Sequence, residues 1–398
     1  ATVARSEFTN NDAQYRYGGA IHADYYVGLG VTNSDFTSNT SYYSGGAIYQ
    51  YRYGALLVDA STFDSNSTDY GHGGAIYAYP ATTGAYDLLV SESDFTDNET
   101  EYHGGAIYAY YIDDLEIEDS SFEGNVANDA NSSYSGGALY LYYNDDVTMA
   151  NNFFCNNEAY YGGGVYSYYA YGGTDHWTNN IFQDNFATHS GGAIYSTTNY
   201  YNNLINNTFV GNEATYNGGD AYYYATYTTA LNNAFAYTVS GDSLYASDYN
   251  TDYYSTFTYN NWYAIGGSIS TGYFSGLSST TGSLTSAPGF SSYSLDGDCS
   301  NDDLTLASGS AMIDAGNPAY KDPDGTTADI GAYGGPGSSL VDADGDGYYS
   351  GTDCDDNDPS VYPGASDTWY DGVDSDCAGD SDYDQDGDGE DSDSYGGD

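Results

Sequence analysis

The sequence predicts an all-β fold, a β-solenoid in which similar coils stack along one axis. Three observations predict it. The phrase GGAIYAY occurs at 73–79 and again at 104–110, with variants in other repeats. A second phrase, phenylalanine followed three residues later by asparagine, alternates with the first. The apolar residues lack helical spacing, whereas glycine, β-branched and aromatic residues are abundant, as is typical of a β-solenoid.

The second phrase sets the length of one coil. Its phenylalanines recur every 27 to 32 residues, and the longer intervals carry extra loop residues such as 128–133. A degraded ninth copy is expected at FTYN, 257–260. We expect a stack of phenylalanines inside the solenoid: Phe8, Phe36, Phe63, Phe95, Phe122, Phe154, Phe182 and Phe209. One coil cannot bury its apolar face alone, and repetition supplies the neighbour.

Strand alternation divides the glycine phrase into inner and outer positions. If Ile76 and Ala78 point inward, Tyr77 and Tyr79 point outward. The inner column is then apolar throughout: Ile21, Ile48, Ile76, Ile107, Leu139, Val165, Ile194 and Ala221. The asparagines of the second phrase are expected at a turn, bonded to the next coil and tolerant of a left-handed backbone: Asn11, Asn39, Asn66, Asn98, Asn125, Asn157, Asn185 and Asn212.

The outer positions predict two tyrosine ladders on one sheet. The first comprises Tyr49, Tyr77, Tyr108, Tyr140, Tyr166, Tyr195 and Tyr222. The second comprises Tyr51, Tyr79, Tyr110, Tyr142, Tyr168 and Tyr224. Stacked aromatic residues could simply stabilise the sheet, each pair by roughly 0.5–1 kcal/mol. Thirteen exposed tyrosines exceed that need, so we predict a face that packs against sugar rings or another copy of the chain.

Charge and cysteine content exclude several classes of function. The chain has 58 acidic and 4 basic residues, a net charge of −54, which disfavours nucleic acid and anionic membranes as partners. It contains no run of 18 apolar residues, so membrane insertion is not expected. Four cysteines fit an oxidising, secreted location, and the chain begins within the repeat, as a processed or incomplete sequence would. Of three possible disulfide pairings, Cys354 with Cys377 is favoured because both lie in one short acidic segment.

Residues 340–398 contain 19 Asp and 1 Glu but no Lys, Arg or His. A disordered acidic tail is one interpretation, but the spacing favours calcium loops. In DADGDGYYSGTD, 342–353, the oxygen ligands at loop positions one, three, five, seven, nine and twelve are Asp342, Asp344, Asp346, Tyr348, Ser350 and Asp353. In DYDQDGDGEDSD, 382–393, the corresponding ligands are Asp382, Asp384, Asp386, Asp388 and Asp393. Oxygen ligands without histidine favour Ca²⁺ over zinc or copper. Asp322, Asp324 and Asp329 are a weaker metal candidate, or they cap the last coil.

The combination of GGAI with FxxN resembles the repeats of polymorphic outer-membrane proteins on bacterial surfaces, over about 1–270. The wider architecture resembles the right-handed parallel β-helix of the pectate-lyase-like superfamily. This resemblance implies about ten coils and a rod of roughly 50 Å at ~4.8 Å per coil. Segments 286–290 and 306–335 resemble the closing coils of secreted bacterial β-helices. We therefore expect a parallel β-helix over 1–338, with closing coils at about 286–338, and a small Asp-rich calcium-loop module over 339–398.

The segment 342–377 resembles the metal-binding repeat of MopE-type secreted bacterial proteins. The resemblance implies a disulfide between Cys354 and Cys377. It also implies further metal ligands: Asp353, Asp355, Asp358, Asp371, Asp374 and Asp376.

Catalysis is not expected. Lyases of the superfamily generally use an Arg or Lys base beside calcium-binding acids, whereas the basic residues here, Arg5, Arg16, Arg52 and Lys321, lie outside a plausible groove centre. The pairs at 113–114 and 145–146 are the best hydrolase candidates, with turn roles favoured. His72 and His103 align with serines of other coils at what we interpret as an undemanding turn. No Ser/His/Asp or Cys/His grouping is readable.

The sequence thus predicts a secreted, bacterial cell-surface structural or adhesive protein, stabilised by Ca²⁺ and self-assembling into a fibre. A polysaccharide-binding or polysaccharide-degrading protein, lyase or hydrolase, is the alternative, which would make glycans a partner.

Overall fold

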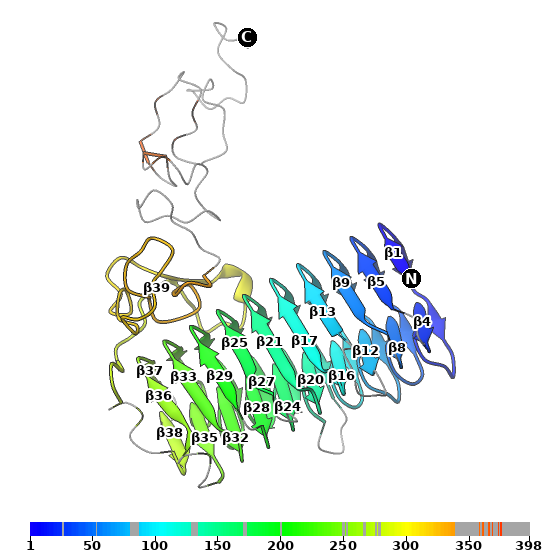
Figure 1. Ribbon diagram of the computed structural model, residues 1–398, viewed down its shortest axis with the longest axis horizontal. Helices are drawn as coiled ribbons and strands as arrows, with labels where there is room; N and C mark the ends of the chain where they lie inside the picture. Colours follow the sequence, from blue (N-terminus) through cyan, green and yellow to red (C-terminus); the bar gives the residue numbers. More distant parts are fainter. Residues whose placement is uncertain are drawn as a thin grey trace, which may run out of the picture.

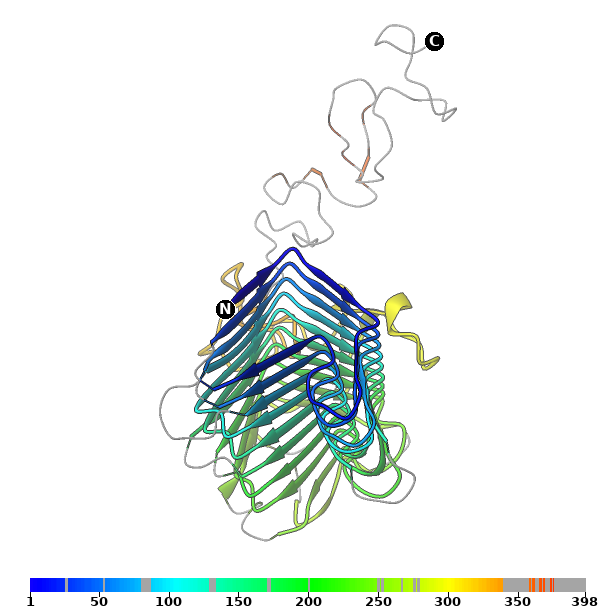
Figure 2. The same cartoon turned by 90° about the vertical axis from the view of Figure 1, so that its right-hand side faces the viewer.

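The structure is a computed structural model. It describes residues 1–25, 28–52, 54–79, 87–128, 134–169, 173–199, 201–248, 251, 254–265, 268–274, 277 and 280–338, with 358, 360, 361, 365, 366, 368, 373 and 375. The described chain is a parallel β-solenoid of about nine turns, close to the ten predicted, so the predicted fold is confirmed. Figure 1 shows the coils in order along the rod, and Figure 2 looks along the stack from its N-terminal end.

Sheet A is a ten-stranded parallel sheet in which each strand pairs with the strand one coil away. Its strands are β1 (Thr2–Ala4), β5 (Leu29–Thr32), β9 (Leu56–Asp59), β13 (Asp87–Ser91), β17 (Asp114–Glu118), β21 (Asp146–Ala150), β25 (Asp175–Thr178), β29 (Asn202–Ile205), β33 (Thr228–Leu231) and β36 (Thr256–Thr258).

Sheet B, which follows sheet A in each coil, carries the phenylalanines. Its strands are β2 (Glu7–Thr9), β6 (Asp35–Thr37), β10 (Thr62–Asp64), β14 (Asp94–Thr96), β18 (Ser121–Glu123), β22 (Phe153–Cys155), β26 (Ile181–Gln183), β30 (Thr208–Val210), β34 (Ala234–Ala236) and β37 (Asn261–Tyr263). Consecutive rings of the predicted column stack with centroids 4.7–4.9 Å apart and interplanar angles of 1–7°. From Phe36 onward these side chains are fully buried, which confirms the predicted stack.

Sheet C is short and eight-stranded. Its strands are β3 (Asp12–Ala13), β7 (Thr40–Ser41), β11 (Ser67–Thr68), β15 (Glu99–Thr100), β19 (Val126–Ala127), β23 (Glu158–Tyr161), β27 (Phe186–Ser190) and β31 (Glu213–Ala214). The glycine pair follows each of these strands. Gly73 has φ of +68°, and a Cβ on Gly74 would collide with the carbonyl of Gly105 in the next coil, so both positions require glycine.

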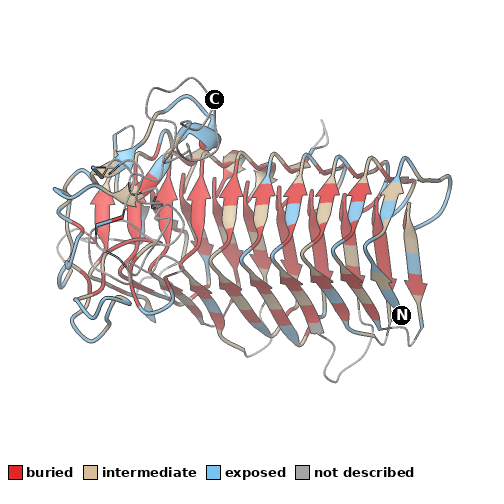
Figure 3. Cartoon of the chain, turned by 90° about the horizontal axis from the view of Figure 1, so that it is seen from above, coloured by how far each residue is buried: buried red, intermediate tan, exposed pale blue. Residues whose placement is uncertain are grey.

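Sheet D contains the glycine-phrase strands and is again ten-stranded. Its strands are β4 (Ile21–Asp24), β8 (Ile48–Tyr51), β12 (Ile76–Tyr79), β16 (Ile107–Tyr110), β20 (Leu139–Tyr142), β24 (Val165–Tyr168), β28 (Ile194–Thr197), β32 (Ala221–Tyr224), β35 (Leu244–Ala246) and β38 (Ser270–Gly272). Ile76 pairs with Ile48 and Ile107 in register, and Ile76 and Ala78 are buried, as the alternation predicts. Along many strands buried residues alternate with partly exposed ones, and exposed residues are frequent in the turns and lateral loops (Figure 3).

A buried asparagine ladder runs along the turn between sheets B and C. Each side-chain oxygen accepts from the backbone N–H and the side-chain amide of the preceding coil, as Asn66 Oδ1 does from Asn39 at 3.0 and 2.9 Å. The expected bonds between coils are therefore present. The expected left-handed backbone is one residue earlier, at Ser38 and Ser65 with φ of +52° and +55°. The preceding residue makes the bend, and the asparagine points inward.

A second ladder, which sequence reasoning missed, runs along the turn between sheets A and B. Its members are Ser34, Ser61, Ser93, Ser120, Asn152, Asn180, Asn207, Asn233 and Asn260. A sequence signal existed, because a serine or asparagine stands two residues before each phenylalanine.

The assignment of FTYN to the phenylalanine column is wrong. Phe257 pairs with Ala230 in sheet A, and Asn260 belongs to the second ladder. Phe235 and Trp262 continue the phenylalanine column, with ring centroids 4.8 Å from Phe209 to Phe235 and 4.5 Å from Phe235 to Trp262. Both ladders contain asparagine, so the FxxN spacing matched the turn between sheets A and B instead of the turn between sheets B and C.

Residues 286–338 do not continue the stack as closing coils. They contain an antiparallel pair, β39 (Phe290–Ser292) and β40 (Asp303–Leu306), and a 3₁₀ turn, η2 (Cys299–Asn301). The segment packs beside the late coils (Figure 1). The Asn179 amide donates to the carbonyls of Ala332 and Gly334, both at 2.7 Å, and Cys155 forms a disulfide with Cys299. Specific side-chain bonds therefore hold this segment laterally.

Candidate interaction face and metal-binding segment

The first tyrosine ladder lies on the outer surface of sheet D in the predicted register. Neighbouring rings from Tyr49 to Tyr222 have centroids 4.5–5.2 Å apart and interplanar angles of 0–9° beyond the first pair, which is at 13°. Tyr245 extends the ladder by one coil at 5.2 Å. The rings are stacked face to face along the rod, so each ring covers the faces of its neighbours.

This first ladder is less exposed than expected. Tyr49, Tyr108 and Tyr140 are only 7–8% exposed. Residues that precede the glycine pairs cover them, as His72 covers Tyr108 at 4.5 Å and His103 covers Tyr140 at 4.3 Å. Burial, followed by the neighbouring phenols, raises the pKa of Tyr140 well above its usual range, so the hydroxyl stays protonated. Fewer than the expected thirteen tyrosines of the two ladders are therefore exposed.

The second ladder is the more accessible one. Its members from Tyr51 to Tyr168 are half-buried, and Tyr224 is 47% exposed. Ring centroids are 4.5–5.2 Å apart with interplanar angles of 17–56°, so the stacking is looser. Burial, with the charges of neighbouring phenols, raises the pKa of Tyr110 to about 12. The Tyr110 hydroxyl therefore remains a hydrogen-bond donor at neutral pH.

A third tyrosine row, missed by sequence reasoning, borders the second. Tyr111, Tyr143 and Tyr169 occupy the turn after sheet D with φ of +55° to +61°. Tyr111 stacks on Tyr143 at 5.0 Å and 8°, and Tyr143 lies 4.9 Å from Tyr169. The doubled tyrosines at 110–111, 142–143 and 168–169 were the available signal. In coil two, Arg52 occupies this row and donates to Tyr25 and Tyr51, each at 2.8 Å.

We define the tyrosine face as these three rows on and beside sheet D. Because the ring faces of the first row are covered by neighbouring rings, that row presents ring edges and hydroxyls. Such a surface is amphipathic and rigid, and it can combine apolar contact with hydrogen bonding.

His72 and His103, which were expected at an undemanding turn, make specific contacts between coils. His72 and His103 stack at 5.2 Å and 4°. The Ser44 hydroxyl accepts from the His72 backbone N–H at 3.1 Å, and His103 Nδ1 accepts from Ser135 N–H at 3.2 Å, so this column carries bonds between coils. Burial lowers the pKa of His72 to about 4 and of His103 to about 3, which keeps both neutral at pH 7.

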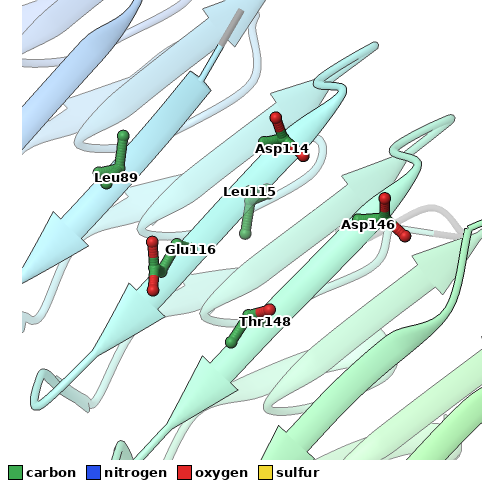
Figure 4. A pocket seen from close by; sticks show the side chains of 6 residues that line it. All are labelled: Leu89, Asp114, Leu115, Glu116, Asp146 and Thr148. Atoms are coloured by element: carbon green, nitrogen blue, oxygen red, sulfur yellow. The ribbon is translucent and has the colours of Figure 1, made fainter. Parts of the chain in front are cut away.

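The candidate hydrolase carboxylates lie on sheet A. Asp114 and Asp146 are register partners that line a surface depression with Leu89, Leu115, Glu116 and Thr148 (Figure 4). Asp146 Oδ1 accepts from Thr174 N–H at 3.1 Å, which is a structural role. Burial and the neighbouring Asp113 raise the pKa of Asp145. The two register partners sit on neighbouring strands of one sheet and do not face each other across a cleft.

Asp322 and Asp329 lie in the lateral segment and accept hydrogen bonds from backbone groups of that same segment. The Asp322 carboxylate accepts from Asp329 N–H at 3.0 Å and from Gly335 N–H. Burial and the charge of Asp322 raise the pKa of Asp329 to about 7. Within the part of the chain that the structure describes, no group of three or more His, Cys, Asp or Glu side chains is arranged to hold a metal ion. These bonds join parts of the lateral segment to one another and do not close the end of the solenoid.

The predicted calcium loops and the Cys354–Cys377 disulfide lie outside the described residues. Of the metal ligands predicted in the Asp-rich segment, Asp358 alone is among the residues that the structure describes. The predicted ligands outside the description are Asp342, Asp344, Asp346, Tyr348, Ser350, Asp353, Asp355, Asp371, Asp374, Asp376, Asp382, Asp384, Asp386, Asp388 and Asp393. Asp358 Oδ1 accepts from Ser360 N–H at 3.1 Å and from its hydroxyl at 2.7 Å, and these bonds lower the pKa of Asp358. The donor set in the sequence is carboxylate oxygen, which suits a hard cation.

Two family models match parts of the chain. The model described as "Putative metal-binding motif", of the copper-binding MopE type, matches 353–383. The Chlamydia polymorphic membrane protein repeat matches 33–50, 60–79 and 181–197. No curated protein and no solved structure matches the chain significantly. Among the described residues, no helix has the length and apolar character needed to cross a bilayer. The chain thus combines a β-solenoid, with repeats similar to those of Chlamydia polymorphic membrane proteins, and a segment similar to the MopE-type metal-binding motif.

Proposed function

We propose that this chain is a non-enzymatic structural or adhesive protein of the bacterial cell surface. In this proposal it is secreted, binds Ca²⁺ through its Asp-rich segment and associates with copies of itself through the tyrosine face. The match to repeats of Chlamydia membrane proteins supports the location. A stack of regular coils supports the structural role, because each coil adds length and side surface without a separate core.

The tyrosine face is the observation that carries the self-association. Much of the first row is covered by neighbouring side chains, whereas the second row is half-exposed and Tyr111 of the third row is 45% exposed. The second and third rows are therefore available to a partner. Rigid tyrosines lose little conformational entropy on binding, and they are enriched in protein interfaces. The surface is long and regular, so a second copy can make the same contact in every coil.

The ring geometry favours protein over sugar as the partner. Sugars stack on exposed aromatic faces, whereas the first-row faces cover one another at interplanar angles of 0–14°. Edges and hydroxyls remain available, and these suit packing against another polypeptide surface.

Calcium is the proposed ion for the Asp-rich segment. The segment matches a metal-binding motif and contains no histidine, and hard carboxylate oxygens prefer Ca²⁺ to copper. Bound Ca²⁺ would also reduce self-repulsion in a chain of net charge −54.

The ion is tested by titrating the full chain calorimetrically with Ca²⁺ and, separately, with Cu²⁺. The triple variant Asp342→Asn/Asp344→Asn/Asp346→Asn should bind at least one Ca²⁺ fewer per chain. A control of equal charge, Glu7→Gln/Asp94→Asn/Glu123→Gln, changes exposed residues of the solenoid and should retain binding. Saturable Cu²⁺ binding without Ca²⁺ binding would contradict the assignment.

The tyrosine face is tested by replacing Tyr110, Tyr142 and Tyr168 with threonine, the residue that Thr197 supplies in the same row. Sedimentation velocity and electron microscopy in Ca²⁺ should show that the wild type associates and the triple variant does not. The control replaces two exposed tyrosines that lie just before strands of sheet A, Tyr201 and Tyr254. A wild type that stays monomeric at high concentration rules out self-association.

The alternative, a polysaccharide hydrolase or lyase, rests on the depression at Asp114 and Asp146. A reducing-end assay and an unsaturated-product assay on acidic and neutral polysaccharides test it. Turnover that Asp114→Asn abolishes would replace the structural proposal with an enzymatic one.

A further inference from the structure

One inner column of sheet A changes character along the rod. In the earlier coils it is aliphatic: Leu29, Leu56, Leu88, Leu115 and Val147. In the next three coils the same column contains Asp175, Asn202 and Thr228, in register with one another. All three side chains are at most 1% exposed. Polar groups thus replace aliphatic ones inside the solenoid.

Polar residues also face this column from the neighbouring sheet and turn. Asn199, in the turn between sheets D and A, donates from Nδ2 to the hydroxyls of Ser167 at 2.6 Å and Ser196 at 3.0 Å. The same amide lies 3.4 Å from Asp175 Oδ2. We call this group of buried polar residues the polar chamber; its members are Ser167, Asp175, Ser196, Asn199, Asn202 and Thr228. Each is at most 4% exposed, so the group is shielded from bulk solvent.

Several chamber atoms have unmet hydrogen-bonding needs. Among the described atoms, Asp175 Oδ1 and both polar atoms of Asn202 are buried without a partner. The buried hydroxyls of Thr228 and Tyr223 lie close together and, within the described chain, have no partner besides each other. A buried, unsatisfied polar atom costs about 1–3 kcal/mol, and an unpaired buried charge costs more. Native interiors rarely leave such groups without a partner.

The chain offers Asp175 no positive partner. Three of the four basic residues, Arg5, Arg16 and Arg52, lie in the first two coils, and Lys321 bonds Thr327 in the lateral segment. His176, next along β25, alternates to the exposed outer surface. Burial, with a contribution from Asp146, raises the pKa of Asp175 well above its usual range. Asp175 is therefore either neutralised by a proton or balanced by a bound ion.

We propose that the polar chamber binds one hard, oxygen-ligated metal cation. The direct ligands are the Asp175 carboxylate and the Asn202 side-chain carbonyl of the next coil. Thr228 lies two strand spacings from Asp175, about 9.6 Å along the rod, so its hydroxyl binds a water of the ion's shell, and Asn202 Nδ2 donates to another such water. One carboxylate balances one positive charge, which matches Na⁺ or K⁺ better than Ca²⁺. This site is separate from the Asp-rich segment, and it does not depend on the function proposed above.

The test compares the full-length wild type with two variants. Asp175→Asn keeps the shape and removes the charge. Asp175→Val/Asn202→Leu/Thr228→Val restores aliphatic residues of the kind found in earlier coils, and it should fold even if the first variant does not. Each protein is desalted exhaustively into choline chloride, and its retained Na⁺, K⁺ and Ca²⁺ are counted per chain by mass spectrometry.

The wild type should retain one ion per chain more than either variant, and the element found identifies the cation. Its urea midpoint should also rise, with saturation, when that cation replaces choline at constant ionic strength. In Asp175→Val/Asn202→Leu/Thr228→Val the urea midpoint should rise only by the amount that cation binding to the unchanged Asp-rich segment produces. Equal ion content in all three proteins, with no midpoint difference between metal and choline salts, would overturn the proposal in favour of a protonated Asp175 and water.

Discussion

Asn98 bonds Asn125 of the next coil twice: its backbone N–H and its side-chain amide both donate to Asn125 Oδ1, at 3.1 and 2.9 Å. The same amide also reaches the carbonyl of Phe63 in the preceding coil, at 2.9 Å. One buried side chain thus connects three coils. The interior contains amide ladders as well as stacked rings, and both determine the register.

Removal of one ladder amide should destabilise the chain strongly. Asn98→Ala removes the acceptor of the Asn66 backbone N–H, one of two acceptors of the Asn66 side-chain amide, and the amide that donates to the Phe63 carbonyl. We expect a loss of about 3 kcal/mol in the free energy of unfolding. Urea denaturation followed by circular dichroism measures it. Asn128→Ala, at an exposed position whose backbone N–H bonds Thr100, is the control and should change stability little. Similar losses in both variants would show that the ladder is energetically unimportant.

Truncation of one ring in the phenylalanine column should leave a cavity. Phe95 is fully buried and stacks on Phe63 and Phe122 at 4.8 and 4.9 Å. Phe95→Ala should therefore cost ~3–5 kcal/mol. The comparison is Leu57→Ala on the outside of sheet A, where the side chain is 40% exposed. A loss below that of the surface variant would contradict close packing of the column.

His72 and His103 should make the chain less stable as the pH falls. Their pKa values in the folded chain, about 4 and about 3, lie below the ordinary value of 6.5. Between pH 6.5 and these folded values the unfolded chain therefore binds more protons than the folded chain. Their contribution is complete above pH 6.5 and declines as the pH falls towards 4. In His72→Ser/His103→Ser, which copies Ser44 at the equivalent position, the free energy of unfolding should decline less over this range.

The buried carboxylates shift stability in the opposite direction, because folding raises their pKa values, to about 6 for Asp220 and about 7 for Asp329. Wild type and variant share these groups, so the difference between the two pH profiles isolates the histidines. The exposed His176→Ser serves as the control. Parallel profiles for wild type and double variant would mean that the histidines are not buried as described.

Reduction of the Cys155–Cys299 disulfide should release the lateral segment before the coils unfold. The bond closes a loop of 144 residues, and loss of such a bond typically costs ~2–4 kcal/mol. In Cys155→Ala/Cys299→Ala, limited proteolysis should cut within 286–338 faster, while far-UV circular dichroism of the solenoid persists. An unchanged cleavage rate would show that bonds such as those of Asn179 are sufficient.

The sequence was sufficient to predict the stacking of the coils because identical phrases must occupy identical environments. Ile76, Phe95 and Tyr77 all lie where alternation and the 27-residue period predict. Errors occurred where one residue type serves two positions. The asparagine of FTYN fits either ladder, and only the register distinguishes Asn260 from Asn212.

The site was predicted less completely, for physical reasons. Exposure of Tyr108 depends on His72 of the preceding coil, and a strand pattern does not contain this contact. The lateral position of 286–338 depends on partners more than 100 residues away, such as Asn206 with Asp329 at 2.8 Å. The polar chamber can be recognised in the sequence only after the coils are aligned by register, which places Asp175 at the position that Val147 occupies in the preceding coil.

The in-register columns have an evolutionary consequence. Because most of the contacts of a coil are with the coils on either side of it, duplication of one coil-length stretch in the gene would insert a unit that fits its neighbours without compensating mutations. Rod length could then vary among descendants of this gene while the cross-section stays constant.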